Sequence, residues 1–385
     1  MNRREVVVTG IGLVTCLGEG ADAHRDALSA GAKPVLDEAT FAPWTIHPAP
    51  PLNLDAQIPK KGDQRQMEPW QRLGTYAAGL ALDDAGARGL VADMHLLVAA
   101  GGGERDVALD EAVGGELAGA NDGGARLNEM LTTGLRPTLF LAQLSNLVAG
   151  NISIVHGVTG SSRTFMGEES AAADALRIAH ARIAEGRIET ALVGGAFTAA
   201  RWDMILLYSG GGGLHRGPWK PLSERKGMVL GSMAAFLVLE SGDHARARGA
   251  RVLARLDAVA TDATRRTVAG TATAAAHDML SRVAPDGVQG VISGASGDPV
   301  ATAAEEAFLH ALGAPVRTPA SLIGHGFEGA FPTHVALAAL ALHRGGFPAP
   351  MDPADAGDPG SPDRILVTAF GAWRGEALAQ LSRAE

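Results

Sequence analysis

TFMGEESAAADALRIAHARIAEGRIETALVGGA, which spans Thr164–Ala196, is the stretch of sequence that decides the fold. Gly167 allows a tight turn that most residues avoid, and from Ser170 onward apolar residues recur at helical spacing. Gly186 is placed to end that helix, and residues 191–193 form a short apolar run typical of a buried strand. The stretch therefore predicts a strand end, a turn, a helix and a second strand.

Two glutamates occupy the turn of this unit. A side chain at the start of such a helix faces backbone N–H groups that have no partner within the helix, and enzymes place nucleophiles there. Here the position holds Glu168 and Glu169. A carboxylate at a helix start is also favourable without any chemistry, by typically ~0.3–1 kcal/mol. The turn can therefore be a catalytic site or the structural remnant of one.

The composition indicates a large globular protein. A chain of 385 residues exceeds the usual size of one domain and can bury a large core, because 46 % of it is hydrophobic. The net charge of −9 and the lack of a basic run disfavour nucleic-acid binding. The single cysteine, Cys16, excludes an intrachain disulfide. We expect neither a metal site nor a resident cofactor.

The sequence carries no signal for a membrane or for export. It has no run of about 18 uncharged apolar residues, the length that a membrane-spanning helix needs. Residues 1–5 lead at once into a predicted strand and lack the apolar stretch of a signal peptide. We therefore expect a cytoplasmic protein with no membrane span.

Both halves of the chain alternate predicted strands with predicted helices. Alternation of this kind is typical of layered α/β architecture with a mainly parallel sheet, and two similar halves indicate an internal duplication. The division falls near Gly242–Arg251, so we expect an N-terminal half over residues 1–245 and a C-terminal half over residues 246–385. Residues 104–126 are acidic and rich in glycine, and we predict a mobile loop there.

Seven segments, in the right order along the chain, resemble β-ketoacyl-ACP synthases, the condensing-enzyme family with the thiolase fold. They are Val6–Gly18, Asn146–Gly157, Gly186 with residues 193–196, residues 220–222 with residues 227–231, Asp243–Arg251, Ser321–His325, and Phe370-Gly371. The resemblance extends over almost the whole chain. It implies an α/β fold of the thiolase-like duplicated kind, layered α-β-α-β-α with two mixed sheets.

The resemblance also assigns roles by position. In the family, a cysteine at the turn carries the acyl chain, two histidines polarise the malonyl thioester and help to expel carbon dioxide, and a lysine orders the site. Counting back from the end of the helix places the cysteine position at Glu169, or at Glu168 if the register slips by one. The first histidine is matched by Ser293 and the lysine by Ala320, whereas the second histidine is retained as His325.

These changes argue against condensation by this chain alone. A carboxylate is a poor nucleophile toward a thioester, and its product would be a reactive anhydride. The joint loss of cysteine, histidine and lysine resembles the chain-length factors of type II polyketide systems. That resemblance implies a heterodimer with a cysteine-containing ketosynthase sister, which takes substrates from the phosphopantetheine of an acyl carrier protein. This chain would then shape the sister's acyl tunnel in polyketide (polyene) or fatty-acid chain elongation.

In this interpretation one mainly apolar segment faces the tunnel of the sister subunit. Its members are Thr138, Leu139, Phe140, Leu141 and Gln143. The alternative for this segment is ordinary core packing. The alternative for the whole protein is a stand-alone malonyl-ACP decarboxylase, or an unusual acyltransferase, that uses Glu169 and His325.

Overall fold

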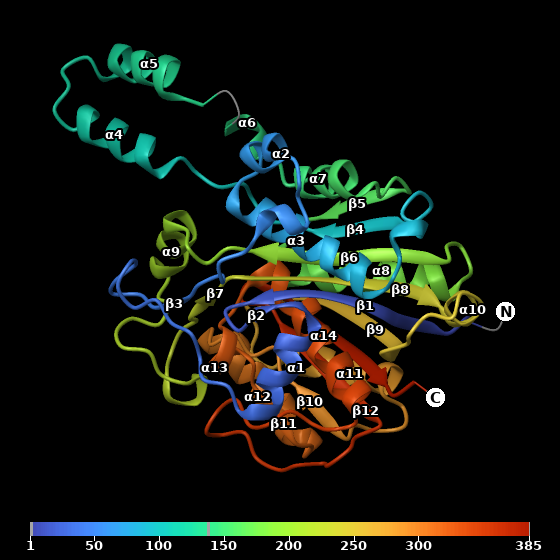
Figure 1. Ribbon diagram of the computed structural model, residues 1–385. Helices are drawn as coiled ribbons and strands as arrows, with labels where there is room; N and C mark the ends of the chain where they lie inside the picture. Colours follow the sequence, from blue (N-terminus) through green and yellow to red (C-terminus); the bar gives the residue numbers. More distant parts are fainter. Residues whose placement is uncertain (1–2, 137–138, 385) are drawn as a thin grey trace.

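One large mixed sheet organises the protein, whose computed structural model describes residues 3–136 and 139–384. The strands are β1 (Val6–Thr15), β2 (Gly18–Glu19), β3 (Ile46–His47), β4 (His95–Ala99), β5 (Ser162–Phe165), β6 (Thr190–Phe197), β7 (Leu230–Gly231), β8 (Met233–Ser241), β9 (Ala254–Arg265), β10 (Gly290–Ile292), β11 (Val316–Arg317), β12 (Arg364–Phe370) and β13 (Arg374–Ser382). Their order in the 11-stranded sheet is β11-β10-β12-β13-β9-β1-β8-β6-β4-β5, with β2 beside β1 (Figure 1). A separate parallel pair joins β3 and β7.

Helices cover both faces of this sheet. The helices of the described chain are α1 (Gly20–Ala30), α2 (Lys61–Gln66), α3 (Pro69–Asp84), α4 (Val107–Leu117), α5 (Gly123–Gly134), α6 (Leu139–Ala142), α7 (Leu147–His156), α8 (Glu168–Ala184), α9 (Trp202–Ser209), α10 (Gly242–Ala247), α11 (Thr271–Val283), α12 (Pro299–Leu312), α13 (Ala320–Ile323) and α14 (Ala330–Arg344). Among the described residues, no helix combines the length and the apolar character that crossing a membrane requires.

The sheet joins two halves of the chain edge to edge. The strands up to Ser241 lie on one side of the join and those from Ala254 onward on the other, and β1 pairs with β9 across it. Two residue pairs make this connection, Val7 with Arg255 and Val8 with Ala254. The predicted layered α/β class is confirmed, but the expectation of a mainly parallel sheet is wrong, because most strand pairings in the large sheet are antiparallel. The two mixed sheets that the resemblance implies are linked here into one.

The helices α8 and α14 form the central layer between the halves. In the largest apolar core they pack against β1, β6 and β8 on one side and against β9, β12 and β13 on the other. Every residue of α14 from Ala330 to Leu342 is buried, and its many alanines allow close packing. Separate cores place α3 and α7 on the outer face of one half and α11 and α12 on the outer face of the other (Figure 1). Outer helices, one half of the sheet, the central helices, the other half of the sheet and outer helices thus succeed one another, which is the predicted α-β-α-β-α order.

The predicted mobile loop over residues 104–126 is wrong, because helix α4 and the beginning of α5 fill most of this range. Asp106 and Asp122 precede these helices, and their carboxylates accept hydrogen bonds from Leu109 N and Ala125 N at 3.3 Å each. No residue of either helix is buried. The two helices form an arm that projects from the body (Figure 1).

Candidate functional site

The turn between β5 and α8 has a strained backbone. Gly167 has a φ of 136°, and Glu168 has a φ of 50°, a left-handed value that residues with a Cβ seldom adopt. Strain of this kind costs of the order of 1–3 kcal/mol and persists where the surrounding structure fixes it. The two glutamates at the turn differ in environment, since Glu168 lines two cavities, whereas Glu169 is 5 % exposed.

Glu169 is paired with His325. The Nε2 atom of His325 lies 2.9 Å from Glu169 Oε1, and both side chains are buried. Burial alone would raise the pKa of Glu169, but the hydrogen bond from His325 and the attraction to it hold the pKa below its usual value. An ionised carboxylate can only accept, so Nε2 carries the hydrogen of this bond. The structure thus brings together two of the four positions that the resemblance singled out.

The start of α8 is also tied to the loop formed by residues 371–374. The backbone N–H of Ala372 donates to Glu169 Oε1 at 3.4 Å, and the next residue of the helix, Ser170, donates through Oγ to Arg374 O at 3.3 Å. Two consecutive residues of the helix therefore hold this loop against the turn.

Ser293 hydrogen-bonds to a different carboxyl group. Its Oγ donates to Glu305 Oε1 at 2.7 Å, and Thr368 Oγ1 donates to the same oxygen at 2.6 Å. Burial raises the pKa of Glu305, and these hydrogen bonds counteract the rise only in part. The serine at the matched histidine position thus donates to one oxygen of a buried acid that the sequence alone did not single out.

Ala320, at the matched lysine position, begins α13 and offers a methyl group where a lysine would offer an ammonium group. Its backbone carbonyl accepts a hydrogen bond from Arg225 Nη2 at 3.2 Å. Arg225 also donates to Lys220 O at 2.8 Å, so both contacts go to backbone carbonyls. Burial lowers the pKa of Arg225 to about 10.

Glu328 is a further acid of this region that sequence reasoning missed. It is 5 % exposed and lies in a short turn, Phe327–Gly329, which follows His325. Burial, together with repulsion from Glu169 and Glu168, raises its pKa to about 7. The available sequence signal was an acidic residue three positions after a retained histidine and next to a strongly apolar helix.

Two cavities meet at the side chain of Glu168. The larger, of about 760 Å³, is bounded by Arg266, Trp373 and Arg374 among others, and the smaller, of about 260 Å³, by Glu328 among others. Glu168 and Tyr208 line both. Glu168 is thus the accessible acid of the turn, while Glu169 lies behind it.

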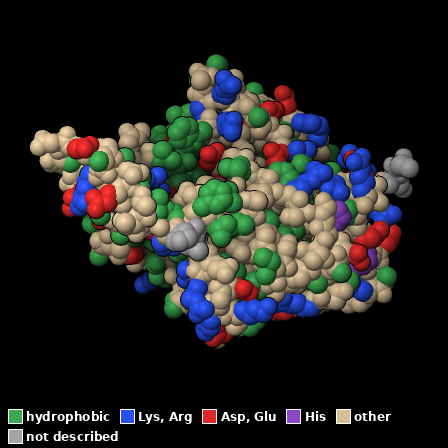
Figure 2. Space-filling view, turned by 90° about the horizontal axis from the view of Figure 1, so that it is seen from above, with side chains coloured by type: hydrophobic (Ala, Val, Ile, Leu, Met, Phe, Trp, Pro, Cys, Tyr) green, Lys and Arg blue, Asp and Glu red, His purple; other side chains and the backbone are tan. Residues whose placement is uncertain are grey.

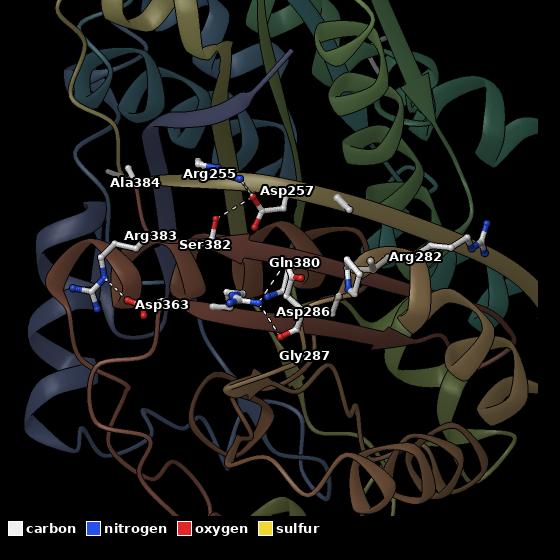
Figure 3. Close-up of a pocket in the computed structure, with 15 residues that line it drawn as sticks. Arg255, Asp257, Arg282, Asp286, Gly287, Asp363, Gln380, Ser382, Arg383 and Ala384 are labelled. Carbon is white, nitrogen blue, oxygen red and sulfur yellow. Dashed lines mark hydrogen bonds and ion pairs between the residues drawn. The ribbon is translucent and has the colours of Figure 1, made fainter. Parts of the chain in front are cut away.

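Another pocket, of about 560 Å³, lies at the opposite ends of β9, β12 and β13 from the loop of residues 371–374 (Figure 3). The nine residues of β13 separate the two regions by roughly 25–30 Å. Its charged side chains pair with one another, as Arg255 does with Asp257 at 2.9 Å and Arg383 with Asp363 at 3.3 Å. We therefore place the functional site at the turn before α8.

The segment expected to face a sister subunit is only partly described, because Thr138 lies outside the described residues. Leu139 begins α6, and the Gln143 side chain donates to the backbone carbonyl of Glu104. Phe140 is 69 % exposed and Leu141 is 38 % exposed. The alternative interpretation, ordinary core packing within this chain, is therefore wrong for the side chains of Phe140 and Leu141. Figure 2 looks onto the face that carries α6 and α7 and shows hydrophobic side chains gathered on it.

Comparison with known proteins identifies relatives of this chain. The family model described as "Beta-ketoacyl synthase, N-terminal domain" matches residues 3–245. The 3-oxoacyl-[acyl-carrier-protein] synthase 2 of Vibrio harveyi is 27 % identical over 270 residues, a match that spans 66 % of this chain and 62 % of that protein. The tetracenomycin polyketide synthase ketoacyl synthase beta subunit of Streptomyces glaucescens is 28 % identical over 368 residues, which cover 88 % of this chain and 85 % of that one.

The fold has close counterparts among solved structures. The structure of the ishigamide ketosynthase/chain length factor superposes with a TM-score of 0.81 at 20 % identity, and the superposition covers 100 % of both chains. This similarity shows a thiolase-like ketosynthase fold. The family model covers more than half of the chain, including the turn before α8. The chain therefore belongs to the β-ketoacyl synthase family.

Proposed function

We propose that this chain is a chain-length-factor-like, non-condensing subunit of a heterodimeric β-ketoacyl-ACP synthase. Its partner is a ketosynthase sister that carries the catalytic cysteine, and substrates arrive on the phosphopantetheine of an acyl carrier protein. The chain contributes a wall of the sister's acyl tunnel and so influences product length in polyketide or fatty-acid chain elongation.

The observation that carries this proposal is the environment of Glu169. Its carboxylate stands at the matched cysteine position, is buried, and accepts hydrogen bonds from His325 and from the backbone of Ala372. A carboxylate held in this way cannot usefully take an acyl group from a thioester. Ser293 stands at the position of the family's first histidine and Ala320 at that of its lysine, so neither position bears an imidazole or an ammonium group. The scaffold of a condensing enzyme is therefore present around a site that lacks its nucleophile.

The similar proteins support the same proposal. One of them is named as the beta subunit of a ketoacyl synthase, and the solved structure with a TM-score of 0.81 is named as a ketosynthase/chain length factor. The first name specifies a beta subunit, and the second pairs a ketosynthase with a chain length factor. We extend that arrangement to this protein as part of the proposal.

A stand-alone decarboxylase or acyltransferase is the weaker candidate. Such an enzyme needs hydrogen-bond donors free to stabilise the charge that develops on an enolate. Here Nε2 of His325 already donates to Glu169, and Glu168, not Glu169, lines both neighbouring cavities. Glu169 and His325, the two residues that this mechanism would use, are therefore hydrogen-bonded to each other.

The partner fits best on the face that carries α6, α7 and β5. Phe140 and Leu141 project there from α6, Ile154 projects from α7, and Met166 follows β5; all four are exposed. β5 is also the last strand of the large sheet, so one of its edges has no neighbouring strand within the described chain. Exposed apolar side chains beside an open sheet edge are features of a protein interface.

Co-expression with a cysteine-bearing ketosynthase encoded beside this chain tests the proposal. We expect the two to elute together as a heterodimer and to elongate acyl chains on an acyl carrier protein. Replacing the sister's catalytic cysteine with alanine should abolish the product, whereas Glu169→Ala in this chain should leave condensation in place.

The controls separate assembly from chemistry. A conservative variant, Glu169→Gln, keeps an acceptor for His325 and reports whether any loss in Glu169→Ala comes from folding. A stable homodimer that ignores every such sister would refute the heterodimer. Loss of product in a correctly assembled Glu169→Gln complex would show instead that the carboxylate takes part in the reaction.

A further inference from the structure

The smaller cavity beside the turn has the chemistry of a cation site. It has a volume of about 260 Å³ and lies between the glycine loop after β4, the start of α8 and helix α9. We propose that this cavity binds a small organic ammonium ion, held between the carboxylates of Glu328 and Glu168 and a wall of aromatic side chains. Such binding goes beyond the proposed role as a subunit, because it belongs to the isolated chain.

Glu328 is the first reason for this assignment. Its carboxyl group lines the cavity, and no basic side chain of the described residues lies within ion-pair distance of it. A Cβ atom added to Gly101 would lie 2.6 Å from Glu328 Oε1, so the acid rests directly on the glycine loop. A buried carboxylate without a counter-ion is costly, and a cation in the cavity would remove that cost.

The other charges of the cavity do not neutralise Glu328. Arg201 lines the cavity too, but its guanidinium pairs with Asp203 at 2.6 Å and donates to Gly103 O at 2.9 Å. These two charges therefore cancel each other. Glu168 adds a second carboxylate to the lining. The balance inside the cavity is negative, which favours a cation and disfavours a carboxylate or phosphate.

Three aromatic side chains form part of the remaining wall. Trp70, Phe197 and Tyr208 line the cavity, and the rings of Phe197 and Tyr208 are packed on Phe327 at centroid distances of 5.0 and 4.6 Å. The faces of such rings attract ammonium groups, with tryptophan the strongest. A fatty acyl chain would gain nothing from the two acids. The combination of carboxylates with aromatic rings therefore selects an organic cation.

A divalent metal fits this cavity less well. Hard cations such as Ca²⁺ and Mg²⁺ need several converging oxygen ligands. Over residues 3–136 and 139–384, no group of three or more His, Cys, Asp or Glu side chains has a geometry that could hold a metal ion. An organic ammonium ion needs fewer carboxylates and can use the aromatic wall instead.

Protons compete with the proposed ligand. The charged groups that act on Glu328 are Glu168, the Glu169–His325 pair and Arg201, and the attraction to Arg201 offsets part of the rise in its pKa. Burial and repulsion from the two other acids raise the pKa of Glu328 to about 7. An ammonium ion binds to the ionised form, so it displaces a proton when the pH is below that value. Affinity should therefore rise through pH 7 and level off above it.

Calorimetric titration of the full chain with n-butylammonium tests the proposal, with n-butanol as an uncharged ligand of similar shape. We expect saturable binding of n-butylammonium at pH 8, about tenfold weaker binding at pH 6, and no saturable binding of n-butanol. At pH 6.5, titrations in two buffers of different ionisation enthalpy should reveal proton release.

Variants locate the site. Glu328→Gln should weaken n-butylammonium binding at least tenfold at pH 8, whereas the exposed Glu224→Gln should leave it unchanged. Equal binding of n-butanol and n-butylammonium, wild-type affinity in Glu328→Gln, or no saturable binding at pH 8 would each overturn the proposal. None of these outcomes bears on co-elution with a sister subunit, so the two proposals can fail separately.

Discussion

At the scale of single residues, Glu169 acts as a structural contact for His325. Glu169→Ala would leave the buried Nε2–H of His325 without its acceptor, at a cost of about 1–3 kcal/mol. We expect a lower thermal unfolding midpoint for Glu169→Ala and a smaller decrease for Glu169→Gln, measured by calorimetry at pH 7. An unchanged midpoint in Glu169→Ala would show that the pair contributes nothing to stability.

The same pair predicts a sign for acid denaturation. The folded-state pKa of Glu169 is lowered, so its stabilising contribution is present above the usual carboxyl pKa and is lost as the pH falls through the folded-state value. The stability difference between the wild type and Glu169→Ala should therefore shrink as the pH falls below 4.5. This trend separates loss of the ion pair from simple loss of packing.

Glu328 predicts the opposite pH dependence. Its folded-state pKa of about 7 exceeds the usual 4.5, so the folded state binds the proton more tightly than the unfolded state. The contribution of the protonated Glu328 to the free energy of unfolding is fully present below pH 4.5. It declines by ~3 kcal/mol in all as the pH rises to about 7. Glu328→Gln should therefore be more stable than the wild type at pH 8, in chemical unfolding without added amine. A variant less stable than the wild type at pH 8 would contradict this assignment.

Residues of the site differ in how far the sequence could predict them. Glu169 and His325 were found by counting positions along a resembling segment, and this needs no knowledge of packing. Glu305 and Glu328 were not found, because their role depends on burial by segments distant in sequence. Glu305, for example, lies on α12 and accepts a hydrogen bond from Thr368 on β12, a contact that forms only when the helix packs on the sheet.

At the scale of elements, the arm formed by α4 and α5 shows where composition misleads. Glycines and acidic residues in this segment suggested a loop, but Asp106 and Asp122 are helix caps. An acidic residue directly before a helix is a start signal as well as a mark of solubility, and Asp106 precedes good helix formers whereas Asp122 precedes two glycines. Capping was therefore the information that could have predicted these helices from the sequence.

The short helix α6 carries the prediction about product length. Phe140 is exposed in the single chain, and in the proposed heterodimer it faces the sister's tunnel. Phe140→Ala should lengthen the products, because a smaller side chain leaves more room at the tunnel wall. Mass spectrometry of the acyl chains released from the carrier protein measures this effect. Val300→Ala, an exposed apolar position on α12, is the matched control and should leave the length distribution unchanged. Equal lengths in all three complexes would argue against a tunnel role for α6.

At the scale of the whole molecule, the sequence predicted the layers better than the sheet. Alternating strands and helices predict a layered α/β architecture, because each helix must cover a sheet face, and the family resemblance implies the order α-β-α-β-α. The link between the halves rests on two residue pairs of β1 and β9, and Val7 and Val8 look like any other buried strand residues. Pairing between strands so far apart in sequence depends on the assembled core, so the sequence pattern could not show it.

The open face beside β5 gives a prediction for assembly. Ile154 is 71 % exposed on α7, so Ile154→Glu should change the stability of the single chain by less than about 0.5 kcal/mol. In the proposed heterodimer the same glutamate would be buried without a partner, which costs about 2 kcal/mol or more. That cost corresponds to a dissociation constant raised about 30-fold.

Light scattering coupled to size-exclusion chromatography measures this change at concentrations near the dissociation constant of the wild-type complex. Val300→Glu places the same charge at a 56 % exposed position on α12, in the other half of the molecule, and should leave the complex intact. If Ile154→Glu and Val300→Glu weaken the complex equally, added charge and not burial is the cause. If neither weakens it, the partner does not occupy the face formed by α6, α7 and β5. Dissociation in Ile154→Glu alone would place α7 in the interface, next to the strand edge from which the chain enters the turn at Glu168.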